Sequence, residues 1–219
     1  MQKKSTVSVI GAGRLKSFGL RAGSCCWTAE NNFMNHKELE AESMDILVVS
    51  DNHGSEEVLK QVLDRHQEGV SAVLHCGDSE ASPDDKMLNN VHIVQGNVDS
   101  PGNFPDELTV DVGHIKTYLT HGHLYQVKTS YASLFSKAEQ INADLVCSGH
   151  THVAGAFEED GTIFVNPGSL LLPQERPEQT YAIVNVSNQG QSINVHFYER
   201  DSGNELLDLS KSFPFPEGE

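Results

Sequence analysis

The sequence lacks the features of a membrane protein and of a disulfide-rich protein. No apolar run approaches the roughly 20 residues that a membrane-spanning helix needs, and the N-terminus has no apolar stretch like that of a secretory signal. The only cysteines form no C-x-x-C pair of the kind that holds structural zinc: Cys25, Cys26, Cys76 and Cys147. Nothing in the sequence demands an oxidising compartment, and a cytoplasmic location is expected.

Two common catalytic motifs and a complete dinucleotide site are also missing. There is no P-loop and no G-x-S-x-G nucleophile motif. The stretch VSVIGAGRLKSFG superficially resembles the opening of a dinucleotide-binding fold, but Lys16 stands where the third glycine is required. No complete βαβ unit fits before Met44. A dinucleotide site and a covalent enzyme intermediate are therefore not expected.

Basic residues are scarce, with 15 Lys and Arg against 31 Asp and Glu and a formal net charge of −16 at pH 7. The excess of acidic residues lies after residue 43, since residues 1–43 contain more basic than acidic side chains. So acidic a surface repels a polyphosphate backbone, and a nucleic-acid polymer is not an expected partner. A small anionic ligand can still bind where metal cations dominate the local field.

The composition divides the chain into an extension, a domain and a tail. Residues 1–43 mix Gly, Ser, Asn and Lys around short apolar patches and are expected to be disordered or outside the native domain. Met44, followed at once by DILVVSD, has the character of a natural domain start. The domain is expected to span residues 44–202, and residues 203–219 to form an acidic C-terminal tail.

From Met44 onward the hydrophobic pattern alternates between strands and helices, which indicates an α/β fold. Helices are expected at 55–67, with Ser55 as N-cap, and at 131–141. The strands expected in the first part span residues 46–50, 72–76, 91–95, 109–112, 115–120 and 145–148. Those expected in the last third, with antiparallel pairing, span residues 153–157, 162–165, 181–186 and 192–198.

Five of the expected strands end at potential metal ligands. The motifs are VVSDNHG (Asp51, His53), LHCGD (Asp78), VQGN (Asn97), LTHGH (His121, His123) and CSGHTH (His150, His152). Loops at the carboxyl ends of strands converge in α/β sheets. Residues i and i+2 of an extended segment point to one side, so two of the motifs are each expected to aim two donors into one cavity. The glycines that directly precede ligands are expected where the backbone approaches closely: Gly77, Gly96 and Gly149.

The donors are carboxylates, imidazoles and one amide oxygen, without a thiolate. This mixture suits Mn²⁺, Fe²⁺, Co²⁺, Ni²⁺ or Zn²⁺, and seven protein ligands suit two ions that share a bridging carboxylate. Any one of these residues alone is more often a cap or a turn residue; their joint occurrence after successive strands favours a metal site. Four other histidines are interpreted as structural: His66, His75, His92 and His114.

The order D-x-H, G-D, G-N-x-D, H-G-H, G-H-x-H resembles that of the calcineurin-like metallophosphoesterases, in particular their small bacterial and archaeal phosphodiesterases. The resemblance spans Met44 to Tyr198. It implies a four-layer α/β/β/α sandwich with two mixed sheets and two divalent ions, with Mn²⁺ favoured. The ligands it implies are Asp51, His53 and His152 for the first ion, Asn97, His121 and His150 for the second, and Asp78 as the bridge. VNPGS resembles a family loop in which Asn166 and Ser169 have structural roles.

One departure concerns the proton donor. Many relatives have a histidine after the asparagine of the third motif, where this chain has Val98. His123 is the candidate substitute because it lies two residues after His121. A metal-bound water, or a leaving group that needs no acid, is an open alternative. Asp99 is expected to orient a histidine or a water.

The implied reaction is hydrolysis of a phosphodiester by in-line attack of a metal-bridging hydroxide. Two other functions stay open: a phosphomonoesterase or nucleotide phosphatase with the same site, and a non-catalytic scaffold like a eukaryotic retromer subunit of this fold. The loops at 79–89 and 100–107 lack Arg, which mildly favours diesters. The expected partner is a small phosphate ester and not a membrane, and formation of a homo-oligomer is left open.

Overall fold

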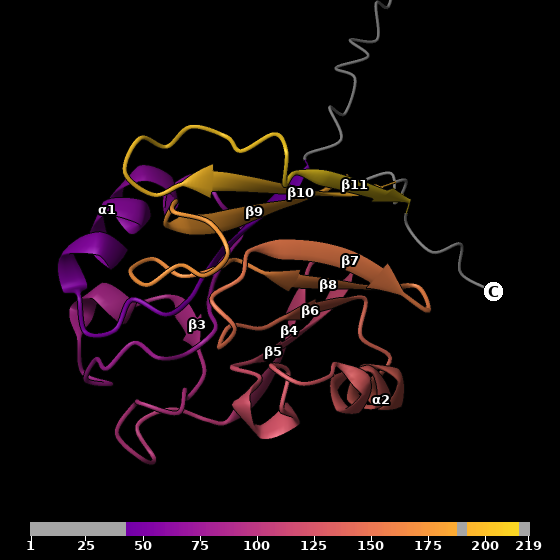
Figure 1. The fold of residues 1–219 in the computed structure, drawn as a ribbon, viewed down its shortest axis with the longest axis horizontal. Helices are drawn as coiled ribbons and strands as arrows, with labels where there is room; N and C mark the ends of the chain where they lie inside the picture. The colour runs from indigo at the N-terminus through magenta and orange to yellow at the C-terminus, as the bar shows by residue number, and fades with distance from the viewer. Residues whose placement is uncertain (1–42, 188–191, 215–219) are drawn as a thin grey trace, which may run out of the picture. The chain divides into compact units, whose positions relative to one another are not determined.

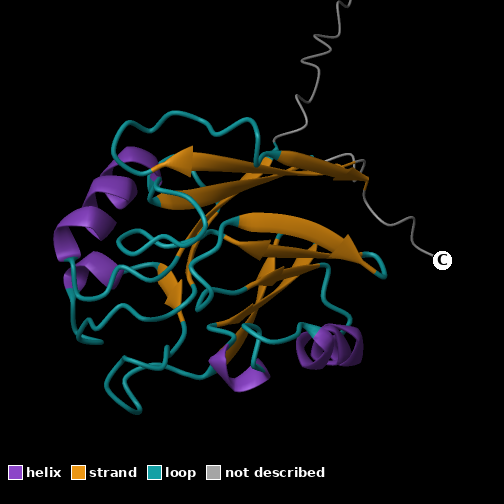
Figure 2. Cartoon of the chain, viewed as in Figure 1, coloured by secondary structure: helices purple, strands orange, loops and turns teal. Residues whose placement is uncertain are grey.

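Two mixed β-sheets carry the fold of residues 43–187 and 192–214, the part of the chain that the computed structural model describes (Figures 1 and 2). The expected extension at residues 1–43 lies outside this part except for Ser43, so it stays a prediction. The secondary structure agrees with the sequence pattern in order and type. No helix of the described part is long and apolar enough to cross a membrane.

The first sheet has six strands in the order β11-β10-β9-β1-β2-β3. Toward the β3 end of this sheet, β1 pairs in parallel with β2, and β2 pairs in parallel with β3. The other pairs are antiparallel, with β9 beside β1, β10 beside β9 and β11 beside β10. The strands span Met44–Val49 (β1), Ala72–His75 (β2), Val91–Ile93 (β3), Thr180–Val186 (β9), Ser192–Glu199 (β10) and Lys211–Pro214 (β11).

The second sheet has five strands in the order β4-β5-β6-β8-β7. The expected hairpin joins β4 and β5, and β5, β6 and β8 run in parallel. The antiparallel strand β7 forms one edge of this sheet. The strands span Glu107–Val112 (β4), Ile115–Thr120 (β5), Leu145–Cys147 (β6), Gly155–Glu159 (β7) and Thr162–Asn166 (β8).

Side chains that alternate along the strands build three apolar layers. On β1, Ile46 and Val48 face the other sheet in the central core, whereas Leu47 and Val49 pack against helix α1 (Glu56–His66). Helix α2 (Ala132–Ile141) covers the outer face of the second sheet. Two short 3₁₀ helices, η1 (Lys86–Leu88) and η2 (His123–Tyr125), lie in the loops. This arrangement confirms the four-layer α/β/β/α sandwich with two mixed sheets.

The expected boundary at residue 202 differs from the structure. The segment beyond it continues in contact with the first sheet, because Tyr198 bridges to Glu205 and β11 pairs with β10. Lys211 Nζ also donates to the carbonyl of Ala156 across the sandwich at 2.7 Å. Half of the side chains of this segment (residues 203–214) are exposed, and the others are only partly buried. Its membership of the domain therefore depends on backbone pairing that the hydrophobic pattern does not reveal.

Candidate metal centre

The loops that follow β1 and β2 are joined by backbone hydrogen bonds that place their acidic residues together. Asp51 N donates to the carbonyl of Gly77 at 3.1 Å, and His53 N to that of Asp78 at 3.0 Å. In the second sheet, Gly149 N donates to the carbonyl of His121 at 3.1 Å, which joins the loops after β6 and β5. Parallel neighbours end at one edge of each sheet, and here both edges meet at one site.

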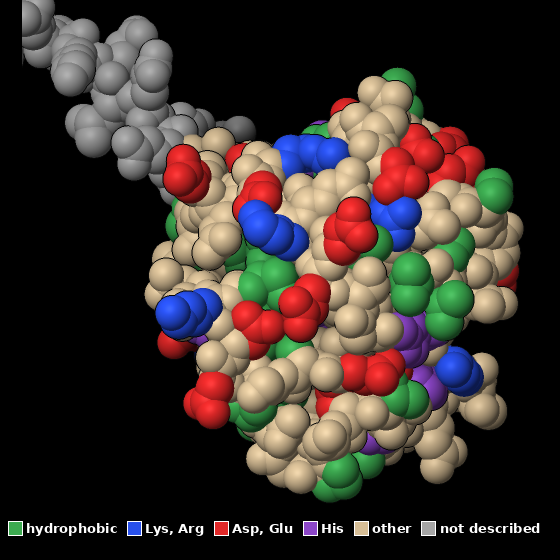
Figure 3. All heavy atoms as spheres, turned by 90° about the vertical axis from the view of Figure 1, so that its left-hand side faces the viewer, with side chains coloured by type: hydrophobic (Ala, Val, Ile, Leu, Met, Phe, Trp, Pro, Cys, Tyr) green, Lys and Arg blue, Asp and Glu red, His purple; other side chains and the backbone are tan. Residues whose placement is uncertain are grey.

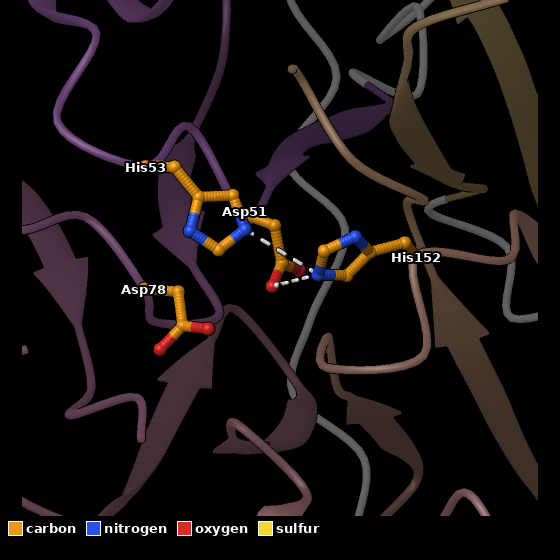
Figure 4. Close-up of side chains that lie close together, drawn as sticks. All are labelled: Asp51, His53, Asp78 and His152. Atoms are coloured by element: carbon orange, nitrogen blue, oxygen red, sulfur yellow. Dashed lines mark hydrogen bonds and ion pairs between the residues drawn. The ribbon is translucent and has the colours of Figure 1, made fainter. Parts of the chain in front are cut away.

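Four side chains converge in a first group made of Asp51, His53, Asp78 and His152, one donor atom of each lying within 4.8 Å of the others. Figure 4 shows the four side chains pointing toward a common space. The Nε2 atom of His152 lies 3.1 Å from Asp51 Oδ1 and 3.4 Å from His53 Nε2. Asp51 and Asp78 are buried, and both histidines are partly exposed.

A second group lies around His121. The Nε2 atom of this buried side chain is 3.1 Å from Asn97 Oδ1 and 3.3 Å from Asp78 Oδ2. The His150 ring lies with its centroid 5.0 Å from that of His121. Asp78 therefore lies beside His121 of the second group and is also a member of the first group. A carboxylate that bridges two metal ions has to lie between two such groups.

Hydrogen bonds at Nδ1 orient two histidine rings so that their Nε2 atoms point toward the centre. His152 Nδ1 lies 2.7 Å from the carbonyl oxygen of Leu172, and His121 Nδ1 lies 2.7 Å from that of Cys76. A carbonyl oxygen only accepts, so each Nδ1 carries the proton and each Nε2 of a neutral ring presents a lone pair. This support of the outer nitrogen is the usual arrangement of metal-binding histidines.

The donor set fits a divalent cation. Asp51 Oδ1 is buried and accepts no hydrogen bond of suitable geometry from the described residues, although His152 Nε2 lies close to it. A buried carboxylate oxygen without a donor is costly, and a cation among these atoms would satisfy it. The Nε2 atoms of His53 and His152, 3.4 Å apart, would both be available to such an ion.

Two groups of the centre, Asp78 and His150, have ionisation states that suit metal binding at neutral pH. Burial disfavours the charged form of Asp78, but the hydrogen bond and charge of His121 and the N–H of Val98 lower its pKa to about 2. Burial and the nearby His121 lower the pKa of His150 to about 4. The close Asp51 carboxylate raises the pKa of His152, so a cation at its Nε2 would compete with a proton. Asp78 is thus a carboxylate and His150 a neutral imidazole, the forms that coordinate metals.

The backbone at the centre is left-handed at five of the seven expected ligands, with φ between 45° and 66° at Asp51, His53, Asp78, His150 and His152. The expectation that paired donors use an extended segment is therefore wrong. Each pair is presented by a tight turn in a conformation that non-glycine residues seldom adopt. Such strained positions concentrate at functional sites because the surrounding contacts must enforce them.

The glycines before the ligands allow this close packing. A Cβ at Gly96 would lie 2.0 Å from Asp78 Oδ1, and one at Gly149 would lie 2.0 Å from Ser50 Oγ. Gly77 has φ of 96°, and a Cβ there would lie 2.9 Å from His121 Nδ1. The sequence prediction of close backbone approach at these three positions is confirmed.

Comparison with known proteins agrees with this geometry. A family model described as the calcineurin-like phosphoesterase superfamily domain matches residues 44–189. The chain belongs to this superfamily. The Asp/His cluster is thus a candidate divalent-metal site in a family of phosphoesterases.

The match to this chain covers nearly the whole length of each of the following relatives. "Probable metallophosphoesterase YsnB" of Bacillus subtilis is 40% identical over 166 residues, which are 76% of this chain and 96% of the relative. The crystal structure of a Streptococcus pneumoniae protein described as a predicted phosphoesterase has a TM-score of 0.75 at 34% identity, covering 79% of this chain and 98% of that one. Vps29 of Entamoeba histolytica, complexed with Zn²⁺, has a TM-score of 0.62 at 23% identity, covering 78% and 99%, and shows the shared fold alone.

The carboxylate of Asp99 joins two of the loops that carry the donors. Its Oδ2 accepts hydrogen bonds from the backbone N–H groups of Asp78 (2.9 Å) and Gly96 (2.7 Å). Its Oδ1 accepts from Ser79 Oγ (3.1 Å) and from the N–H of Glu80 (2.6 Å). Its carboxylate makes no hydrogen bond to a histidine in the described part of the chain. Asp99 instead joins the loop after β2 to the loop after β3, and so positions Asp78 beside Asn97.

His123 lies beside the second group without joining it. Its ring centroid is 5.4 Å from that of His121 and 6.1 Å from that of His150. Its Nδ1 is buried and has no hydrogen-bond partner among the residues that the structure describes. Burial and the nearby His121 lower its pKa. A buried polar atom without a partner is uncommon and frequently belongs to a functional group.

The structure supports the structural interpretation of other polar residues near the site. His75 is fully buried, accepts from Gly77 N and donates to Asn52 Oδ1 at 2.8 Å. Ser169 Oγ donates to the carbonyl of Asp51 at 2.8 Å, and Asn166 Nδ2 donates to that of Gly149 at 2.7 Å. These two residues hold the backbone under the ligands.

Sequence reasoning did not single out Lys128, a charged residue near the centre. Its ammonium group is close enough to oppose protonation of both His150 and His152. It follows η2 in a segment whose sequence shows no motif. Only the path of the chain from β5 to α2 brings this lysine beside the ligands.

Proposed function

We propose that the protein is a two-metal phosphodiesterase of the cytoplasm that hydrolyses small phosphate diesters. The main support is the convergence of two donor groups on Asp78, with the outer nitrogens of His121 and His152 held by backbone carbonyls. The proposed cofactor is a pair of divalent ions, with Mn²⁺ favoured and Ni²⁺, Co²⁺, Fe²⁺ or Zn²⁺ also suited to these ligands. In this proposal Asp51, His53 and His152 hold one ion, Asn97, His121 and His150 hold the other, and Asp78 binds both.

Different residues of the chain have different roles in the proposed reaction. The chemistry that a bound metal pair supplies is activation of water near neutral pH and neutralisation of charge on the phosphate oxygens. Asp99 fixes the spacing of Asp78 and Asn97 through four hydrogen bonds to their loops. Lys128 adds positive charge at the side of His150 and His152, which favours an anionic substrate. His123 is the non-ligand imidazole available to the leaving oxygen.

The surroundings of the centre favour diesters over monoesters. Three exposed hydrophobic side chains flank it: Val98 follows Asn97, Leu124 follows His123, and Leu172 supports His152 through its carbonyl. Figure 3 shows hydrophobic side chains beside the histidines that reach the surface on this face. A diester carries organic groups on two sides of phosphorus and a single negative charge. Apolar surroundings suit those groups better than they suit a dianionic monoester.

A direct test compares bis(4-nitrophenyl) phosphate with 4-nitrophenyl phosphate. The protein is stripped of metal, then supplied with Mn²⁺, Ni²⁺, Co²⁺ or Zn²⁺, and Asp78→Asn serves as the control. Metal-dependent release of nitrophenolate from the diester that disappears in the variant supports the proposal. Faster turnover of the monoester would favour the monoesterase. Turnover of neither ester by the metal-loaded protein would contradict both enzymatic functions.

A non-catalytic scaffold is the second candidate, because Vps29 shares the fold. The observation that weighs against it here is the complete set of seven donors. A scaffold would not need strained left-handed backbone at five of them. Metal binding without hydrolysis in the test above would favour this candidate.

A further inference from the structure

A pocket of about 880 Å³ opens directly beside the metal centre. One end of it is lined by His152 and Thr151, and it continues along the edge strand β7. Its size is within the range of small-molecule sites in proteins, roughly 300–1,000 Å³. None of the other six expected ligands lines it, so the pocket extends away from the ions and from the reacting phosphate.

Aromatic side chains form much of the apolar wall. Tyr131, Phe157 and Phe164 line the pocket. Tyr131 meets Phe157 edge to face with ring centroids 5.3 Å apart, and Phe157 stacks on Phe164 at 5.2 Å. The ring of Tyr131 is also fixed from outside by stacking on Phe135. These rings are packed in place, so a planar group entering the pocket meets a preformed aromatic surface.

The polar part of the wall carries charges of both signs. Lys128 and Lys211 face the pocket together with Glu175 and Asp208. Lys211 Nζ already donates to a backbone carbonyl, and Asp208 lies 3.4 Å from Arg176 Nη1. Lys128 lies near the metal end, where its charge acts on His150 and His152. The lining therefore carries two positive and two negative side chains, and both Lys128 and Glu175 lie toward the His152 end, where Gln174 N donates to the carbonyl of His152 at 3.0 Å.

We propose that this pocket binds an aromatic ester group of the substrate, with the phosphate at the His152 end and the ring against Tyr131 and Phe157. The inference rests on the proposed function and specifies its substrate class: a phosphodiester in which at least one esterifying group is aromatic. The aromatic wall accepts the ring, and Lys128 at the His152 end accepts the singly charged phosphate. A methyl ester leaves the pocket empty and gains nothing from it.

Gly155 offers a way to fill the pocket without disturbing the fold. It lies on β7 in the pocket lining, and a Cβ added there meets no atom within 4 Å. Leucine at this position places its side chain in the open space. Gly69 provides the matched control, because an added Cβ meets only the carbonyl oxygen of His66, at 3.7 Å, just beyond helix α1.

The experiment measures binding of two monoanionic phosphonates to the Mn²⁺-loaded protein by calorimetry. Methyl phenylphosphonate carries the ring on a phosphorus–carbon bond that is not hydrolysed, and methyl methylphosphonate lacks the ring. We expect the phenyl compound to bind at least about tenfold more tightly. The Gly155→Leu variant should lose this preference, Gly155→Ala should reduce it, and Gly69→Leu should keep it.

Equal affinity of the two phosphonates for the unmodified protein would overturn the pocket assignment. So would a preference that survives in a folded Gly155→Leu protein, with folding checked by thermal melting. These outcomes are separable from failure of the proposed function. Diester hydrolysis without aryl preference overturns the pocket alone, whereas aryl preference without metal-dependent hydrolysis overturns the phosphodiesterase and keeps the pocket.

Discussion

The two donor groups of the metal centre differ in how completely the protein assembles them. In the first group, the donor atoms of Asp51, His53, Asp78 and His152 already lie within 4.8 Å of one another. In the second, His121 is buried and held, but Asn97 is exposed and offers only a neutral amide oxygen. Preorganisation lowers the cost of binding. We therefore expect the first group to bind its ion more tightly than the second.

The largest expected effect comes from the residue that the two groups share. Asp78→Asn should lower kcat by more than about a hundredfold. Substitution of residues that only orient a metal ligand already lowers metal affinity or activity by about 10–100-fold. Asp78→Asn should also reduce the bound metal from two ions to one or fewer, as measured by elemental analysis after gel filtration. Retention of two ions would show that the groups are independent of Asp78.

The comparison itself is tested by removing one histidine from each group. His152→Ala should weaken the tighter metal-binding step, and His150→Ala the weaker step, each by about tenfold or more. Titration with Mn²⁺ followed by calorimetry separates the two steps. The opposite result would be a lower affinity of the first Mn²⁺-binding step in His150→Ala and an unchanged first step in His152→Ala. It would show that the second group binds its ion more tightly than the first.

The close backbone packing under Asp78 should make Gly96 sensitive to a single methyl group. Gly96→Ala places a Cβ 2.0 Å from Asp78 Oδ1, and the overpacking should lower the free energy of unfolding by about 1–3 kcal/mol. Urea denaturation measures this change. Gly155→Ala is the control with open space, and similar losses in both variants would refute the steric explanation.

Asp99 should affect the second group more than the first, with the smallest change in stability. Asp99→Asn puts an amide donor against backbone N–H groups and should cost about 1–2 kcal/mol of unfolding free energy. It should also weaken the second metal-binding step, because Asp99 holds the loops of Asp78 and Asn97 together. The exposed Asp84→Asn serves as the control. Equal weakening of both steps would mean that Asp99 supports the whole centre.

The sequence predicted the fold because its signals were local. Continuous apolar strands such as 46–50 and the helical stripe of 55–67 needed no tertiary information, and the structure confirms the four-layer sandwich. The candidate ligands could be selected because each followed a strand end, and the structure brings them to one site. The geometry of the paired donors could not be predicted, because the left-handed backbone at Asp51 and His150 depends on contacts with other loops.

The sequence by itself determined the order of the donors and the α/β class, since these depend on residue type and local periodicity. Tertiary structure decided the role of Asp99, whose partners lie up to 21 positions away. It also placed β11 in the sheet and gathered Lys128, Gly155 and Lys211 around one pocket. Contacts between segments so far apart in the chain leave no periodic signal, because they depend on how the two sheets pack and where their edges meet.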